Sequence, residues 1–191
     1  MSEHSSPILV RLTPPGRGAI ATLLVEGPGA RAAVQTRFRS PGGRALAALA
    51  SDRLAFGHFG PQPGEEVVVR VRSERSVELH CHGGLAAVAL IERALIEQGC
   101  HPLAWQEWAA MGSRSPIRAA AIALAEARAE RTAAILLDQY QGALDRAVDE
   151  VLACLDRNDA TGARQRLERL LERAPVGLHL VQPWRVVLAG P

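Results

Sequence analysis

The feature that most limits the fold of this chain is a change of character at Pro116. Before it, short apolar and often β-branched segments are separated by turns rich in Gly and Pro, which is typical of strands. After it, the sequence is rich in Ala and Leu, and Pro116 stands at a position that opens helices. The sequence therefore predicts an α+β protein with a mixed first half and a helical second half.

The first half contains two predicted strand pairs. ILVRLT and AIATLLVE are joined by a turn containing PPGRG, and EVVVRVRS is joined to SVELHC by a short polar turn, so the second pair predicts a hairpin. Helices are predicted for GPGARAAVQTRF and for LAAVALIERALIEQG. In the longer helix Leu85, Val88, Ala89, Leu95 and Ile96 recur near the helical period, and Gly99 supplies the stop.

The second half predicts a helical bundle. The run from Pro116 to Arg157 is longer than the usual globular helix and must pack against other helices. Asn158 or Asp159 could cap a further helix, which Pro175 is expected to end. The chain finishes with PWRVVLAGP, an apolar strand followed by a glycine turn, as at the start of a P-loop nucleotide domain. The second Gly, the Lys and the Ser or Thr of a P-loop are missing, so no nucleotide can bind there.

Composition narrows the class of protein. The 191 residues are 48% hydrophobic with a formal charge of +2, and all 22 basic residues are Arg, so there is no strong electrostatic footprint for nucleic acid. Arg70, Arg72 and Arg75 are interpreted as solvated strand-face residues, with a local basic patch as the alternative.

Three cysteines without a CxxC pair argue against a disulfide framework and favour the cytoplasm. No export signal and no apolar run of membrane-spanning length is found, so no membrane insertion is expected.

The stretch VELHCHGG, residues 77–84, allows three interpretations. Alternation places Glu78, His80 and His82 on one strand face, where two histidines could begin a zinc site but lack further ligands nearby in sequence. Alternatively, Gly83 and Gly84 form a structural corner between strand and helix. The third interpretation is a pocket wall, in which the Glu78 carboxylate accepts hydrogen bonds from two adjacent N–H groups of a ligand.

Three blocks together resemble the TrmE/MnmE family of tRNA-modification GTPases. They are TPPGRGAIA (13–21) with EGP (26–28), VELHCHGG (77–84) leading into its helix, and GLHLVQPWRVVLAGP (177–191), which looks like the start of the family's GTPase domain. Between them, EARAE (126–130) and QG (141–142) fit the family's first long helix. The resemblance covers nearly the whole chain.

The resemblance implies three parts: a TrmE-like folate-binding and dimerisation domain over residues 1–112, similar to the folate-binding aminomethyltransferase fold, the first part of a helical domain over 113–183, and the first strand of a GTPase domain over 184–191. It implies a homodimer holding 5-formyl- or methylene-tetrahydrofolate. GTP, Mg²⁺ and K⁺ would bind in the GTPase domain, of which Gly190 would be the first P-loop residue. Family members modify C5 of the tRNA wobble uridine together with a flavoprotein partner.

Departures from the family pattern affect the implied folate site. An Arg that contacts folate in the family aligns with Leu24, and a Lys after a PGEF motif has no counterpart, whereas the Glu is retained as Glu78. Because each lost cationic contact is worth ~1.5–3 kcal/mol, folate affinity should be weak or lost. Glu107 and Trp108 could edge the pocket, although Trp105 and Trp108 at helical spacing also suit a hydrophobic plug between domains.

Three functions remain open. The first is dimerisation with folate binding in a tRNA-modifying GTPase, and the second is a dimerisation module that has lost folate. The third, RNA binding through the arginines, would show a salt-dependent affinity for tRNA. Arg17, in the PPGRG turn, is either a solvated turn residue or a contact to the ligand or to the partner subunit.

Overall fold

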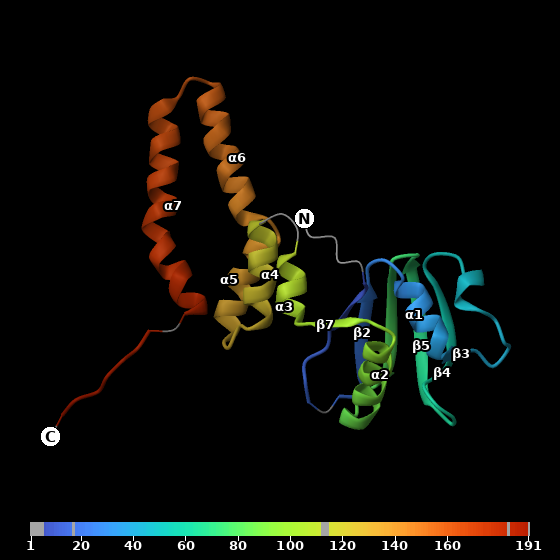
Figure 1. Ribbon diagram of the computed structural model, residues 1–191. Coiled ribbons are helices and arrows are strands. Elements are labelled where there is room, and N and C mark those ends of the chain that lie inside the picture. Colours follow the sequence, from blue (N-terminus) through green and yellow to red (C-terminus); the bar gives the residue numbers. More distant parts are fainter. Residues whose placement is uncertain (1–5, 17, 112–114, 183, 191) are drawn as a thin grey trace. The chain divides into compact units, whose positions relative to one another are not determined.

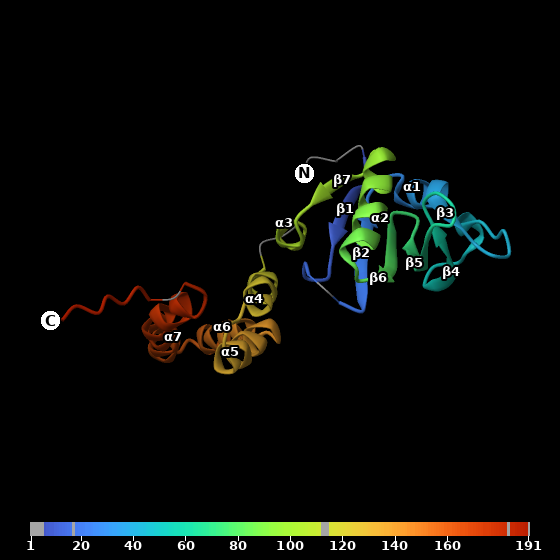
Figure 2. The ribbon, with the colours of Figure 1, turned by 90° about the horizontal axis from the view of Figure 1, so that it is seen from below.

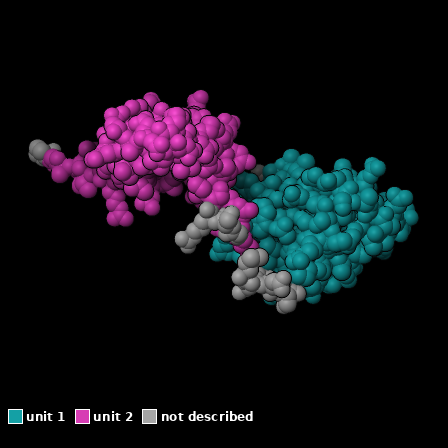
Figure 3. All heavy atoms as spheres, turned by 90° about the horizontal axis from the view of Figure 1, so that it is seen from above, with its two compact units in different colours: residues 1–108 teal, residues 109–191 magenta. Residues whose placement is uncertain are grey.

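The computed structural model describes residues 6–16, 18–111, 115–182 and 184–190 (Figure 1). The chain divides into two compact units, residues 1–108 and 109–191, which Figure 3 shows in different colours. Each unit is described separately below.

Unit 1 is built on one mixed sheet. Its strands are β1 (Ile8–Arg11), β2 (Ile20–Glu26), β3 (Phe38–Arg39), β4 (Arg53–Phe59), β5 (Glu65–Ser73), β6 (Ser76–His82) and β7 (His101–Leu103). They are ordered β3-β4-β5-β6-β2-β1-β7, and every pairing is antiparallel except that of β1 with β7. The helical elements of this part are α1 (Ala30–Arg37), a 3₁₀ turn η1 (Leu46–Ala48), α2 (Leu85–Glu97) and α3 (Trp105–Ala110), whose end crosses the unit boundary.

Helices α1 and α2 lie on one face of the sheet, as the two ribbon views show (Figures 1 and 2). Strand alternation sends Leu23, Leu79 and Val69 to this face, where they are fully buried beneath the helices. The main core therefore lies between the two helices and the sheet. The opposite face, called the open face from here on, carries the even-numbered residues of β2, β4, β5 and β6.

The predicted elements of the first half are confirmed. β1 pairs with β2, β5 pairs with β6 as a hairpin, and α1 and α2 form where helices were expected. The apolar residues that recur near the helical period of α2 are only partly buried: Leu85, Ala89 and Ile96 are exposed, while Val88 and Leu95 are buried together with Ile91 and Ala94. Gly99 follows α2 with a φ of +84°, a conformation that suits glycine at a helix end.

Unit 2 is helical, with elements α4 (Pro116–Ala125), α5 (Glu130–Tyr140), α6 (Ala143–Asp156) and α7 (Ala160–Val181). α4 packs on α5, and α6 packs on α7. Few of its side chains are buried among the described residues: Ala120, Leu136, Val151, Cys154 and Ala163. The chain as a whole is therefore α+β, as predicted.

In the helical part, two expectations are corrected and one is confirmed. The long run from Pro116 is broken into three helices; the break at Gly142 has a physical cause, a φ of +85° that a helix cannot contain. Asp159 caps α7 by accepting a hydrogen bond from the Gly162 N–H at 2.8 Å, as one of the two predicted caps. Pro175 does not end α7, because a proline removes only its own N–H donor and the helix continues to Val181.

The strand predicted at the C-terminal end does not form. Residues 184–190 have no regular secondary structure and are exposed, with no strand beside them among the described residues. A strand needs a neighbour to accept and donate its ladder hydrogen bonds. No described helix of this structure is both long and apolar enough to cross a membrane.

Candidate functional site

The open face of the sheet brings together the polar residues of three strands. The register places Leu24 of β2 opposite Glu78 of β6, and Glu78 opposite Arg70 of β5. In the next row Thr22, His80, Val68 and Phe56 lie side by side across β2, β6, β5 and β4. Because side chains on one face of neighbouring strands are in contact range, these two rows form one continuous surface.

Glu78 is largely buried, with 12% of its side chain exposed. Arg70 and Arg72 each reach it with an Nη1 atom, both at 3.4 Å, and Nε2 of His80 lies 3.8 Å away. Arg70 also pairs with Asp52 at 2.9 Å, and the Asp52 hydrogen bond and charge, followed by the charge of Glu78, raise the pKa of Arg70. The predicted acceptor residue is therefore already neutralised within the chain, and a ligand would have to compete with two arginines.

Arg70 and Arg72 were interpreted as solvated residues, and their pairing with Glu78 was missed. The turn at Glu74 and Arg75 pairs Ser73 with Ser76, and a regular hairpin continued from this pair would place Val71 opposite Glu78. A register shift between Val71 and Ser73, which the sequence pattern does not reveal, brings Arg70 opposite Glu78 instead. Arg72, two residues along, shares this face and completes the cluster.

A shallow depression of about 200 Å³ lies beside the Glu78 cluster. Its lining includes Ile20, Phe56, Val68, His80 and His82. His80 Nδ1 is 3.1 Å from Oγ1 of Thr22, and His82 Nδ1 is 2.5 Å from Oε1 of Glu65 on β5. Both rings are thus held by protein partners at the rim of the depression.

The three interpretations of VELHCHGG have different outcomes. Among the described residues, no group of three or more His, Cys, Asp or Glu side chains is placed to hold a metal ion. The corner interpretation is supported for Gly83, whereas no contact requires a glycine at position 84. Gly83 donates its N–H to the Ala19 carbonyl at 3.0 Å, and a Cβ at Gly83 would lie 2.2 Å from the Gly18 oxygen. Gly84 has open space around it and precedes α2 with an ordinary φ of −70°.

The Gly83 contact joins two motifs that are distant in the sequence. The loop containing PPGRG and the end of HCHGG touch backbone to backbone, which only glycine allows at Gly83. Arg17, the predicted contact residue of that loop, lies outside the described residues. Gly83 therefore has a structural role, because it lets the end of β6 lie against the loop before β2.

Trp105 and Trp108 lie on the part of the open face formed by β1 and β2. They pack against a small cluster of Ile8, Val10 and Leu24, and the Trp108 Nε1–H donates to Glu26 at 2.6 Å. Leu24 is fully buried in this cluster. The position that aligns with a folate-contacting arginine of the resembled family therefore makes a hydrophobic contact here. Glu107 is exposed on α3. Gly190 lies in the irregular segment 184–190 and is exposed.

The two cysteines of unit 1, Cys81 and Cys100, are buried. Burial raises the pKa of each thiol to about 11, so both are protonated at neutral pH. Neither is an activated nucleophile. The open face therefore offers paired charges, two histidines and exposed apolar groups, which suit binding rather than covalent chemistry.

The chain is similar to proteins named tRNA modification GTPase MnmE. It is 30% identical over 217 aligned residues to the protein of Synechococcus sp. strain WH7803, covering 92% of this chain and 46% of that protein. It is 32% identical to the protein of Parasynechococcus marenigrum strain WH8102 over 68% of this chain and 32% of that one. For Heliobacterium modesticaldum the identity is 26% over 93% of this chain and 47% of its relative. No family model matches the chain. It spans about half the length, or less, of these curated relatives.

Proposed function

Because the chain belongs to the MnmE family of tRNA modification GTPases, whose N-terminal part it matches, we propose that its role is homodimerisation within a tRNA-modifying GTPase. The whole protein would hydrolyse GTP and take part, with a flavoprotein, in modification of C5 of the tRNA wobble uridine. GTP, Mg²⁺ and K⁺ belong in this proposal to a GTPase domain rather than to the sheet of unit 1.

The observation that carries this proposal is the apolar content of the open face. Ile20, Leu54 and Phe56 are 64%, 63% and 51% exposed, although β-strand residues of this size are normally covered. Phe56 and Leu54 stand on one strand, and Val68 and His80 connect Phe56 across the sheet to Thr22. Contiguous exposed apolar groups rimmed by charges are typical of a protein–protein contact surface.

We expect Phe56→Asp to shift the chain from dimer to monomer by at least about tenfold in dissociation constant, because a buried charge in an apolar contact costs more than about 1.4 kcal/mol. Light scattering coupled to size-exclusion chromatography at micromolar concentrations measures the shift. Leu85→Asp is the matched control, since Leu85 is 62% exposed but lies on the helix-covered side of unit 1. A monomeric unaltered chain, or equal dissociation of both variants, would contradict the proposal.

A second candidate function is binding of a reduced folate, 5-formyl- or methylene-tetrahydrofolate. It is favoured by one observation, the retained Glu78 carboxylate next to the 200 Å³ depression. The arginine pairs of Glu78 and the buried Leu24 act against it, so the expected affinity is weak. A pterin would have to replace two charge-assisted contacts with its own N–H donors.

Calorimetric titration with 5-formyltetrahydrofolate tests this candidate. We expect a weak but saturable heat that Glu78→Ala abolishes and that Glu97→Ala, an exposed carboxylate on α2, leaves unchanged. The lost carboxylate removes the acceptor for adjacent N–H groups, which accounts for a loss of about tenfold or more. An unaltered chain that gives no saturable heat has lost folate, and the dimerisation role then stands alone.

A further inference from the structure

The margin of the sheet beside β4 has free backbone groups. β3 pairs only with the last two residues of β4, so among the described residues 53–56 have a strand on one side only, β5. Gly60 donates its N–H to the Arg37 carbonyl at 3.0 Å, and backbone groups alternate in direction along a strand, so the even-numbered residues of β4 turn theirs toward this margin. Leu54 and Phe56 therefore present their N–H and C=O groups outward, where no other described residue hydrogen-bonds to them.

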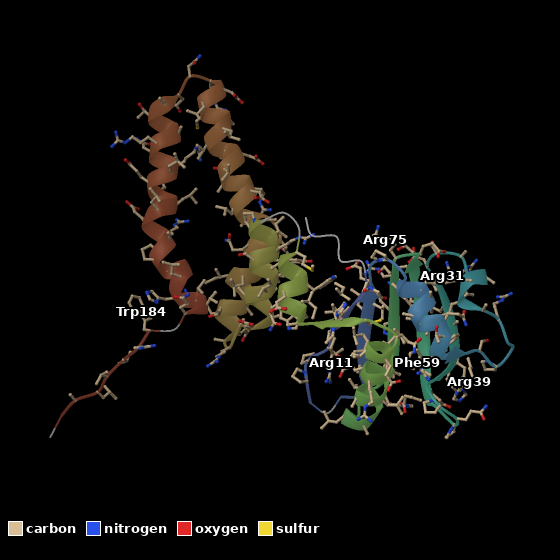
Figure 4. The ribbon with its side chains drawn as sticks, in the orientation of Figure 1. Arg11, Arg31, Arg39, Phe59, Arg75 and Trp184 are labelled. Atoms are coloured by element: carbon tan, nitrogen blue, oxygen red, sulfur yellow. The ribbon has the colours of Figure 1, made fainter. Side chains whose placement is uncertain are left out.

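The segment between β3 and β4 leads away from this margin. Arg39, on β3 (Figure 4), has its carbonyl oxygen 2.3 Å from where a Cβ at Gly57 would lie. Gly57 is an odd-numbered residue of β4, so its Cβ would point to the helix-covered side, and the chain therefore leaves β3 across that side. Leu46 is then fully buried in the main core, where Arg31 of α1 donates to its carbonyl. The chain returns through a turn at Asp52, with a φ of +61°, directly before β4.

The side chains at this margin fit a second copy of the same strand. The two residues with outward backbone groups are both apolar and exposed on the open face. Asp52, just before β4, remains exposed although it pairs with Arg70, and Arg39 lies beside the other end of β4. Glu66, on β5, is one strand farther from the margin. In an antiparallel pair of two copies, the start of each β4 lies beside the end of the other, so Asp52 of one copy approaches Arg39 of the other.

We infer that β4 pairs with β4 of a second copy, antiparallel about a two-fold axis at Ala55, so that one sheet runs through both chains. This inference rests on the proposed homodimerisation and states how its contact is built. Leu54 lies opposite Phe56 of the second copy, and each such pair exchanges both of its N–H···O bonds, which satisfies every outward group. On the open face the two apolar side chains of each pair cover one another.

Ala55→Cys tests this register. Ala55 stands opposite its own copy in a non-hydrogen-bonded pair, whose Cα atoms are about 4.5 Å apart and within reach of a disulfide. Arg53→Cys is the matched control on the same strand face, because its two copies are about 13 Å apart along the strands. Oxidised glutathione is expected to form the covalent dimer at least about tenfold faster with Ala55→Cys, measured by non-reducing electrophoresis. Exposure alone would favour Arg53, which is exposed while Ala55 is half-buried, and the native cysteines are buried.

Amide hydrogen exchange of the unaltered ¹⁵N-labelled chain keeps the test valid if a substitution disturbs β4. The amides of Leu54 and Phe56 should exchange at least about tenfold more slowly at concentrations where light scattering finds the dimer than where it finds the monomer. Suppose that a dimer forms and Phe56→Asp dissociates it, but Arg53→Cys crosslinks as fast as Ala55→Cys or these two amides gain no protection. The strand pairing is then wrong, the proposed homodimer stands on side-chain contacts, and the β4 margin is open to a strand of another protein. A chain that is monomeric at every concentration overturns both.

Discussion

Replacement of Gly83 by alanine is expected to destabilise unit 1 by about 2–3 kcal/mol, because the new methyl group has no space. Its Cβ would lie 2.2 Å from the Gly18 oxygen and 2.6 Å from the Gly18 carbonyl carbon, and both are backbone atoms that cannot move away alone. The hydrogen bond from Gly83 N–H to the Ala19 carbonyl would be strained at the same time. The loop before β2 would separate from the start of α2.

Gly84→Ala is the matched control for this prediction. Nothing lies within 4 Å of a Cβ at Gly84, and its φ of −70° suits alanine, so the expected change is within about 1 kcal/mol. Urea unfolding followed by Trp105 and Trp108 fluorescence measures both variants, in a Trp184→Phe background that removes the signal from the third tryptophan. Equal losses at the two glycines would show that flexibility, rather than the close approach to Gly18, is what position 83 requires.

Arg31→Met is expected to destabilise unit 1 by about 2–4 kcal/mol, because it removes charge-assisted hydrogen bonds to two backbone carbonyls from a buried site. Arg31 is 7% exposed on α1, and its guanidinium donates to the carbonyls of Leu46 and Leu49, at 3.0 Å from Nε and 2.6 Å from Nη2. It also pairs with Glu74 in the turn between β5 and β6. Figure 4 labels the side chain on α1. Arg31 thus connects both the η1 segment and the turn between β5 and β6 to α1.

Arg37→Met serves as the comparison. Arg37 ends the same helix and pairs with Glu97 at 3.1 Å, but both side chains are more than a third exposed, so the expected loss is at most about 1 kcal/mol. Urea unfolding gives the stability of each variant, and amide hydrogen exchange at Leu46–Leu49 shows whether the η1 segment opens first. Similar stabilities for the two variants, with unchanged exchange at η1, would mean that solvent replaces the Arg31 contacts without penalty.

Local sequence patterns were sufficient to predict the strands of unit 1 that lie at its centre. Alternation in VELHCHGG placed Glu78, His80 and His82 together on one strand face, and the structure has Leu79 and Cys81 buried on the other. What alternation cannot supply is the register between strands that are distant in sequence. Leu24 faces Glu78 across β2 and β6, and that pairing follows from the whole sheet rather than from either segment.

The same limit accounts for the features that were missed. β7 has only three residues, one of them Pro102, so it carries no strand pattern and is recognised only by its pairing with β1. Some helices of unit 2 end at residues with a high helix propensity, so propensity does not predict where they end. The boundary between α4 and α5 is set instead by the packing of these two helices on each other. The buried position of Arg31 is a tertiary feature too, since its partners lie 15 to 43 residues away.

The two margins of the sheet limit how unit 1 can associate. β3 at one margin has two residues, and β7 at the other has three, including a proline that offers no N–H. β3 pairs only with His58 and Phe59, so among the described residues the remainder of β4 has a strand on one side only. A strand from another chain would therefore find free backbone groups beside residues 53–56 and almost none beside β7, so any extension of this sheet would start at one margin and not at both.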